Sequence, residues 1–191
     1  YWGVRTYEGG MTAKAVILAG GSTLRRLGIP GEEELYGAGV SYCATCDGAF
    51  FTDEVVGVVG GGDSALDEAL VLTEFASRVI IFHRRGELRG QAVLRDRVLS
   101  HPKIELQYNT VVDTIHGDGQ VDGVVVTDVV TEEPTRVDLS GLFIYVGLDP
   151  NSQYLSEVLP LDNAGHIPTD IWMCTPAAGL LAAGDIRQDS A

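Results

Sequence analysis

A chain of 191 residues is long enough to bury a sizeable core in one large or two small domains. Its 27 acidic residues outnumber 13 basic ones, and the resulting net charge of −14 argues against nucleic acid or anionic membranes as partners. The chain has no run of 18 apolar residues that would predict a transmembrane helix, and its first residues lack a secretory signal. Three cysteines do not make the disulfide framework of a secreted protein, so we expect a cytoplasmic location.

Short apolar runs predict buried strands in the first half of the chain, at residues 13–20, 55–59 and 79–82. Residues 64–76, between the last two runs, carry apolar side chains at helical spacing. This strand–helix–strand order predicts a β-α-β unit and therefore a parallel sheet in an α/β fold. Residues 28–34 hold a Gly-Ile-Pro-Gly break and three glutamates, which we expect to form a surface linker with a solvated acidic face.

The second half changes in character after a short helix expected at residues 91–99. Segments rich in Val and Thr, or alternating in polarity, predict antiparallel strands at residues 104–108, 111–115, 123–130 and 135–139. Residues 142–147 and 179–184 are again apolar runs that predict buried strands.

A glycine-rich sequence stands between the strand at 55–59 and the following helix, and it fits the pattern G-x-G-x-x-A. In such a dinucleotide fingerprint the first glycine makes the tight turn, the second lets the backbone approach a pyrophosphate, and the alanine packs the helix closely on the strand. The helix N-terminus attracts the phosphate charge. The predicted binding residues are Gly60, Gly62, Asp63, Ser64 and Ala65; the alternative is a glycine-rich turn without a ligand.

Basic residues follow the next strand, where an NAD-binding unit would place a carboxylate for the ribose 2′-hydroxyl. Here the position holds His83, Arg84 and Arg85, with Arg89 one helical turn further on. Guanidinium groups can bind a 2′-phosphate that a carboxylate would repel, so the cluster predicts NADPH rather than NADH. The alternative is a surface arginine pair bound to Glu87 or Asp96.

The sequence Cys43-Ala44-Thr45-Cys46-Asp47 carries a second kind of chemistry. Two residues between cysteines allow a reversible disulfide, and Asp47 beside them could transfer a proton or serve only as a helix cap or turn residue. The alternative of half a zinc site requires two more ligands, and only Cys174 and scattered histidines remain, so we expect no metal. Cys174 is expected to be an inert core cysteine.

These motifs resemble bacterial low-molecular-weight thioredoxin reductases in identity, order and spacing. The resemblance lies in residues 41–48, the fingerprint at 60–65 and the basic cluster at 83–85. Further similar segments are residues 29–32, 143–147 with 150–151, and 182–185.

The resemblance implies a Rossmann-like FAD/NAD(P)-binding fold, in which an NADPH domain is inserted into an FAD domain. It places residues 1–27 and 139–191 in a partial FAD domain, and residues 28–138 in the NADPH domain that carries the cysteines. The hinges between them are expected near residues 27–31 and 138–141. The family's first Rossmann unit would precede Tyr1 and its last helix would follow Ala191, so we expect the chain to be an incomplete reductase that binds NADPH and retains little FAD.

The resemblance also implies roles for individual residues. By this resemblance Cys46 lies nearest the flavin, Cys43 completes the disulfide and Asp47 is the acid. It does not decide which of the two thiols first attacks the partner protein. Gly184 and Asp185 contact FAD, and Gly147 lies near it. Electrons then pass from NADPH through FAD and the disulfide to thioredoxin or a similar protein, and the reductase is expected to be a homodimer.

Three rival functions remain at this point. An NADH-dependent reductase coupled to a peroxiredoxin and a dithiol oxidase are both disfavoured by the arginines. A non-enzymatic NADPH-binding module with a structural zinc is the third.

Overall fold

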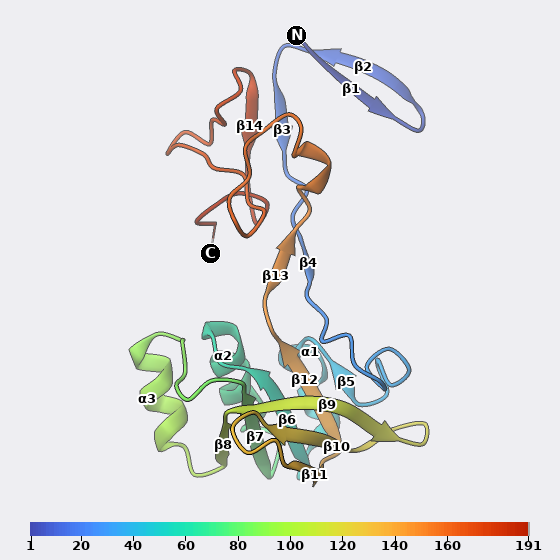
Figure 1. Cartoon of the computed structure of the whole chain (residues 1–191), viewed down its shortest axis with the longest axis vertical. Helices are drawn as coiled ribbons and strands as arrows, with labels where there is room; N and C mark the ends of the chain where they lie inside the picture. The colour runs from blue at the N-terminus through green and yellow to red at the C-terminus, as the bar shows by residue number, and fades with distance from the viewer. Residues whose placement is uncertain (191) are drawn as a thin grey trace. The chain divides into compact units, whose positions relative to one another are not determined.

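The computed structural model describes residues 1–190, which divide into two compact units (Figure 1). One unit is formed by Tyr1–Arg25 together with the segment from Gly147 onward, and the other is Arg26–Val146. Arg25 N–H donates to Gly147 O at 3.0 Å, so the two chain crossings lie side by side. The predicted α/β class is confirmed.

The unit Arg26–Val146 is built on a five-stranded parallel sheet. Its strands, in spatial order, are β5 (Val40–Ser41), β12 (Gly141–Tyr145), β6 (Val55–Gly60), β7 (Arg78–His83) and β8 (Ile104–Tyr108). The helical segments are α1 (Ala44–Asp47), the 3₁₀ turn η1 (Gly48–Phe51), α2 (Asp63–Leu72) and α3 (Ala92–Ser100). An antiparallel layer consists of β9 (Thr110–Gly117), β10 (Val121–Asp128) and β11 (Pro134–Asp138).

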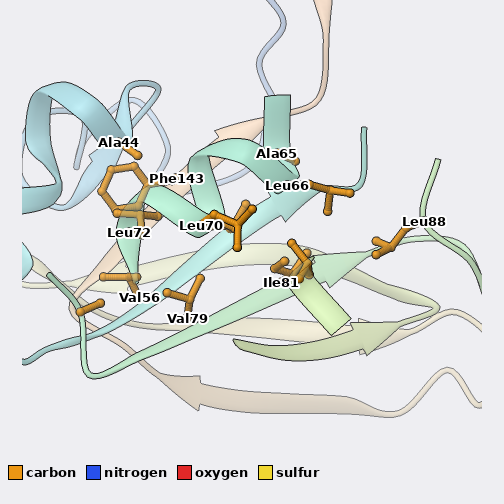
Figure 2. Packing of buried hydrophobic residues seen from close by; sticks show 14 residues of the cluster. Ala44, Val56, Ala65, Leu66, Leu70, Leu72, Val79, Ile81, Leu88 and Phe143 are labelled. Atoms are coloured by element: carbon orange, nitrogen blue, oxygen red, sulfur yellow. The ribbon is translucent and has the colours of Figure 1, made fainter. Parts of the chain in front are cut away.

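Alternation along the strands divides the core between the two faces of this sheet, because successive side chains point to opposite faces. On β7, Val79 and Ile81 pack with the helices, whereas Ile80 and Phe82 pack with the antiparallel layer. Figure 2 shows the helical face, where Leu66, Leu70 and Leu72 of α2 lie over the strands. The parallel sheet is therefore covered on both sides, as its nearly continuous apolar runs require.

The other unit, described by itself, is made of short two-stranded pieces. They are the hairpin of β1 (Trp2–Thr6) and β2 (Gly9–Ala13), the parallel pair of β3 (Val16–Leu18) and β14 (Leu180–Ala182), and the antiparallel pair of β4 (Ser22–Leu24) and β13 (Leu148–Pro150). A 3₁₀ turn, η2 (Gln153–Leu155), adds Leu155 to a small core with Leu159, Ile167 and Ile186. Ile17 is 69% exposed, so the prediction that residues 13–20 form a buried strand is wrong for that side chain.

Two strand assignments correct the sequence analysis. Residues 104–108 were expected in the antiparallel layer, but β8 pairs in parallel with β7 at the edge of the main sheet, where one-sided burial produces an alternating pattern. The strand β12 was expected beyond a domain boundary at residues 138–139, but it lies in the same sheet between β5 and β6. The boundaries between the two compact units lie at residues 25–26 and 146–147. The hinges expected at 27–31 and 138–141 therefore lie inside one unit.

The expected surface linker at residues 28–34 contains a buried carboxylate. Glu32 is 3% exposed, and it accepts hydrogen bonds from Leu27 N–H at 3.0 Å, Gly28 N–H at 2.7 Å and the Tyr42 hydroxyl at 2.6 Å. Burial alone would raise the pKa of Glu32, but these donors favour the charged form and lower the pKa below its ordinary value. Of the three glutamates, only Glu33 and Glu34 form the solvated face that was expected.

Replacing Glu32 by Gln is predicted to lower the free energy of unfolding by about 1–3 kcal/mol at neutral pH, the scale of hydrogen bonds to a charged group. Because the folded-state pKa is lowered, the contribution of Glu32 is present above its unfolded-state pKa and is lost as the pH falls through its folded-state value. The difference between wild type and E32Q should therefore shrink on acidification. Urea denaturation at several pH values measures it, with the exposed neighbour Glu33→Gln as the control; a pH-independent difference would contradict the assignment.

Candidate functional site

A disulfide joins Cys43 to Cys46 at the start of α1, directly after the carboxyl end of β5. The Cα atoms are 5.3 Å apart, and Cys46 N–H donates to Cys43 Sγ at 3.2 Å. Cys43 is half-buried and Cys46 is exposed, so a partner molecule can reach the pair from solvent. The structure thus places the two predicted redox cysteines in one small covalent ring.

Ser41 fixes the position of Asp47 beside this ring. The Ser41 hydroxyl, which is 4% exposed, donates to Asp47 Oδ2 at 2.6 Å and accepts from Cys43 N–H at 3.1 Å. A carboxylate held by a buried hydroxyl has a defined orientation, which a proton donor or acceptor needs. Asp47 stands at the N-cap of the 3₁₀ turn after α1, but its side chain makes no capping hydrogen bond there. Its hydrogen bonds therefore do not support the alternative that Asp47 is only a helix cap.

Two residues that the sequence analysis missed complete the surroundings of the disulfide. Ala44 N–H, next to Cys43, donates to the Tyr145 hydroxyl at 2.8 Å and to Glu68 Oε2 at 3.0 Å. Tyr145 ends strand β12 and Glu68 lies on α2, so three separate elements converge on one backbone amide. No sequence spacing predicts that Tyr145 and Glu68 contact the Ala44 amide, because this contact depends on how the strands pair.

The glycine fingerprint lies at the carboxyl end of β6, as predicted. Gly60 has a φ of +155°, and a Cβ there would stand 2.6 Å from Ala65 Cβ, so its lack of a side chain allows close helix–strand packing. A Cβ on Gly62 would meet no atom within 4 Å, and Gly62 is the N-cap of α2 without a side-chain cap. An anion could therefore approach the first amides of α2 freely.

His83 has a different position from the one expected of a ligand contact. It is 6% exposed, and its two ring nitrogens lie 2.9 Å from Gly60 O and 2.9 Å from Glu87 O. A Cβ on Gly61 would stand 2.3 Å from His83 Nδ1, so only glycine fits there. His83 thus holds the loop after β7 against the glycine turn instead of presenting its ring to solvent.

The three arginines of the cluster are exposed on that loop. Arg84, Arg85 and Arg89 form no ion pair with any residue between 1 and 190, so the alternative of pairs with Glu87 or Asp96 is not found. Arg89 N–H donates to Gly61 O at 2.7 Å, which brings the arginine loop beside the fingerprint.

Of the two polar fingerprint residues, one is engaged in this structure. Asp63 Oδ1 accepts from Gln91 N–H at 2.6 Å and thereby ties α2 to the start of α3, while Ser64 is exposed.

In the other unit, two glycine turns meet at the carboxyl ends of the parallel strands β3 and β14. Gly21 and Gly184 have φ angles of +62° and +74°, with open space where a Cβ would stand. The Ser22 hydroxyl donates to Asp185 Oδ2 at 3.1 Å and joins the turns. The carboxyl ends of parallel strands are the usual place for ligands in α/β proteins. Gly147 is not part of this cluster, since the β4–β13 ladder carries it about 10 Å away from Ser22.

Cys174 was expected in the core but is exposed, so that prediction is wrong. Between residues 1 and 190, no group of three or more His, Cys, Asp or Glu side chains is arranged to hold a metal ion. Within the same part of the chain, no helix is long and apolar enough to cross a membrane.

Residues 4–191 match the pyridine nucleotide-disulphide oxidoreductase family, and the chain belongs to this family. It is 46% identical over 189 residues to a thioredoxin reductase of Peptoclostridium litorale and 45% identical over 179 residues to one of Bacillus subtilis. These alignments cover 96% and 93% of this chain, but 60% and 57% of the relatives. The chain therefore spans about three fifths of the length of these curated relatives.

Solved structures give the same result for the fold. The crystal structure of Lactococcus lactis thioredoxin reductase in the FR conformation superposes with a TM-score of 0.88 at 44% identity, over 99% of this chain and 63% of that one. The thioredoxin reductase of T. acidophilum gives 0.86 at 34% identity, over 98% and 62%. The resemblance to thioredoxin reductases and the Rossmann-like fold are confirmed.

Proposed function

We propose that this chain is the nucleotide-binding and disulfide-bearing part of an NADPH-dependent flavoprotein disulfide reductase that acts on thioredoxin or a similar protein in the cytoplasm. The observation that carries the proposal is the placement of the Cys43–Cys46 disulfide and the glycine fingerprint at the same edge of one parallel sheet. The similarity to thioredoxin reductases supports the reductase assignment. A homodimer as the working form is part of the proposal.

The residues present fit NADPH. The open N-terminus of α2 at Gly62 would take the pyrophosphate, and Ala65 keeps the helix close to β6. Arg84, Arg85 and Arg89, which have no ion-pair partner between residues 1 and 190, would take the 2′-phosphate. In this proposal His83 is a positioning residue that holds the arginine loop in place.

The residues of the other unit fit part of an FAD site. The open turns at Gly21 and Gly184 would admit the cofactor backbone closely, and Asp185 would accept a hydrogen bond from its hydroxyl groups. Gly147 remains a candidate only through the resemblance. When bound, NADPH would supply one hydride and FAD would carry its two electrons to the disulfide, chemistry that no side chain of this chain can provide.

The chain's own groups handle the thiols and the protons. Reduction of the disulfide requires two electrons and two protons, and Asp47, oriented by Ser41, is placed to supply or accept a proton at the cysteines. The exposed Cys46 and half-buried Cys43 can then exchange with a protein disulfide through a mixed disulfide. Phe50, 81% exposed shortly after Cys46, offers an apolar contact for that partner.

Replacing Arg84 and Arg85 together by Ala is predicted to weaken NADPH binding by about 2–3 kcal/mol, roughly 30- to 150-fold, since charged hydrogen bonds to the 2′-phosphate are lost. NADH binding should barely change. Titration calorimetry of the 191-residue chain with each nucleotide measures this, with Arg97→Ala on α3 as the control. Equal weakening of NADPH and NADH binding would show that the arginines do not bind the 2′-phosphate.

Replacing Cys43 or Cys46 by Ser in a full-length, flavin-loaded version is predicted to abolish reduction of protein disulfides. Reduction of the flavin by NADPH should persist, because in the proposed order it precedes the transfer of electrons to the disulfide. Stopped-flow absorbance separates the two steps, and Cys174→Ser is the matched control. Loss of flavin reduction in a folded Cys43 or Cys46 variant is the result that would contradict the proposed order.

Replacing Asp47 by Asn is predicted to slow the proton-coupled steps at the disulfide by roughly 10²- to 10⁴-fold, the usual range for a general acid. Asn retains a hydrogen-bond acceptor for the Ser41 hydroxyl, so the fold should persist. Single-turnover measurements of disulfide reduction test this, with Asp53→Asn as a control for charge. A rate near that of wild type would leave Asp47 as a turn residue.

A further inference from the structure

The amide of Ala44 is the point at which the nucleotide-binding helix contacts the redox segment. Ala44 is 0% exposed and follows Cys43 directly, and its N–H lies 3.0 Å from Glu68 Oε2 and 2.8 Å from the Tyr145 hydroxyl oxygen. The Tyr145 hydroxyl lies 3.3 Å from the same Glu68 oxygen. These three groups form a closed triangle beside one cysteine of the disulfide.

The protonation state of Tyr145 fixes the direction of these hydrogen bonds. Burial first, and then the negative charge of Glu68, raise the pKa of Tyr145 well above its usual range, and the charge of Asp47 adds to the effect. The phenol therefore keeps its proton, accepts from Ala44 N–H and donates to Glu68. The titratable groups around the amide are thus Glu68 from α2, Tyr145 from β12 and Asp47 from α1.

A carboxylate in this position has a specific consequence for the thiols. The disulfide is uncharged, whereas the reduced pair carries negative charge whenever one thiol ionises, and a neighbouring carboxylate disfavours that charge. Glu68 accepts from the amide that directly follows Cys43 in the chain, so its carboxylate is tied to the backbone of the redox segment.

We propose that Glu68 is a positioning residue that shifts the equilibrium of the Cys43–Cys46 pair toward the disulfide, and that the Tyr145 hydroxyl moderates this effect by donating to the carboxylate. The biological meaning rests on the proposed function, but the equilibrium itself requires neither NADPH nor flavin. Dithiothreitol reduces the pair: its two thiols become its cyclic disulfide, and the two electrons and two protons pass to Cys43 and Cys46. A failure of this proposal is therefore separable from a failure of the reductase assignment.

The test is the equilibrium constant for this exchange at about pH 8. Free thiols are alkylated, and mass spectrometry then gives the fractions of reduced and oxidised protein. Glu68→Gln keeps an acceptor oxygen for Ala44 N–H and removes the charge, so we expect the constant for reduction to rise about 3- to 10-fold, equivalent to about half to one pKa unit. Asp67→Asn removes the same charge from the exposed neighbouring position and should change it less than about 2-fold, as expected for a screened surface charge. Equal effects of the two variants, or no effect of Glu68→Gln, would overturn the proposal.

Tyr145→Phe provides an independent arm that keeps the ring and its packing. Removing the hydroxyl takes away one of the two hydrogen bonds that Glu68 Oε2 accepts and leaves that from Ala44 N–H, so the carboxylate charge is less neutralised and we expect the constant for reduction to fall below that of wild type. The opposite signs of the two variants are a signature that a merely structural role would not produce. If Tyr145→Phe and Glu68→Gln both favour the dithiol, the triangle acts through packing and the electrostatic proposal is wrong.

Discussion

The pairing of β12 with two parallel neighbours brings the chemistry of this chain together. In the observed register, Phe143 lies beside Ser41 on one side and Val58 on the other. Two residues further along β12, Tyr145 lies beside Gly60. Because the strands are parallel, the cysteine segment, the glycine turn and Tyr145 all leave the sheet at one edge. A shift by one residue would turn Tyr145 toward the opposite face and remove it from Ala44.

The glycine turn shows a second constraint, which is space. Its backbone is pressed between the first turn of α2 and the ring of His83, with room for no side chain on Gly60 or Gly61. Only Gly62 faces open space, and that is where a phosphate would have to approach. One nitrogen of the same ring lies 2.9 Å from Glu87 O, so a buried side chain helps to position the arginine loop.

Apolar periodicity and glycine placement correctly predicted the elements of the β-α-β unit. The strand at 55–59, the amphipathic helix that begins at the fingerprint and the strand at 79–82 follow from apolar periodicity and glycine placement, and the structure contains all three. The strand β8 was assigned to the wrong layer because alternation looks alike in an edge strand of a parallel sheet and in an antiparallel one.

The remaining errors have a common physical cause, which is that burial and contacts are decided by residues distant in the sequence. Glu32 cannot be told from Glu33 or Glu34 in the sequence, and the hydroxyl of Tyr42 makes the difference. Glu68 and Tyr145 are separated by 77 positions and meet only through strand order. Cys174 was predicted to lie in the core because free cysteines are usually buried, although its segment lies at the surface.

The helix α2 spans both halves of the site. Its first residue borders the proposed phosphate position, and Glu68, five residues on and about 8 Å along the axis, binds the amide beside Cys43. A helix is stiff over so short a length, so a displacement at one end is transmitted to the other. Thermodynamic linkage then imposes a symmetry: by whatever factor a bound nucleotide alters the oxidation equilibrium of the cysteines, oxidation must alter the affinity for that nucleotide by the same factor.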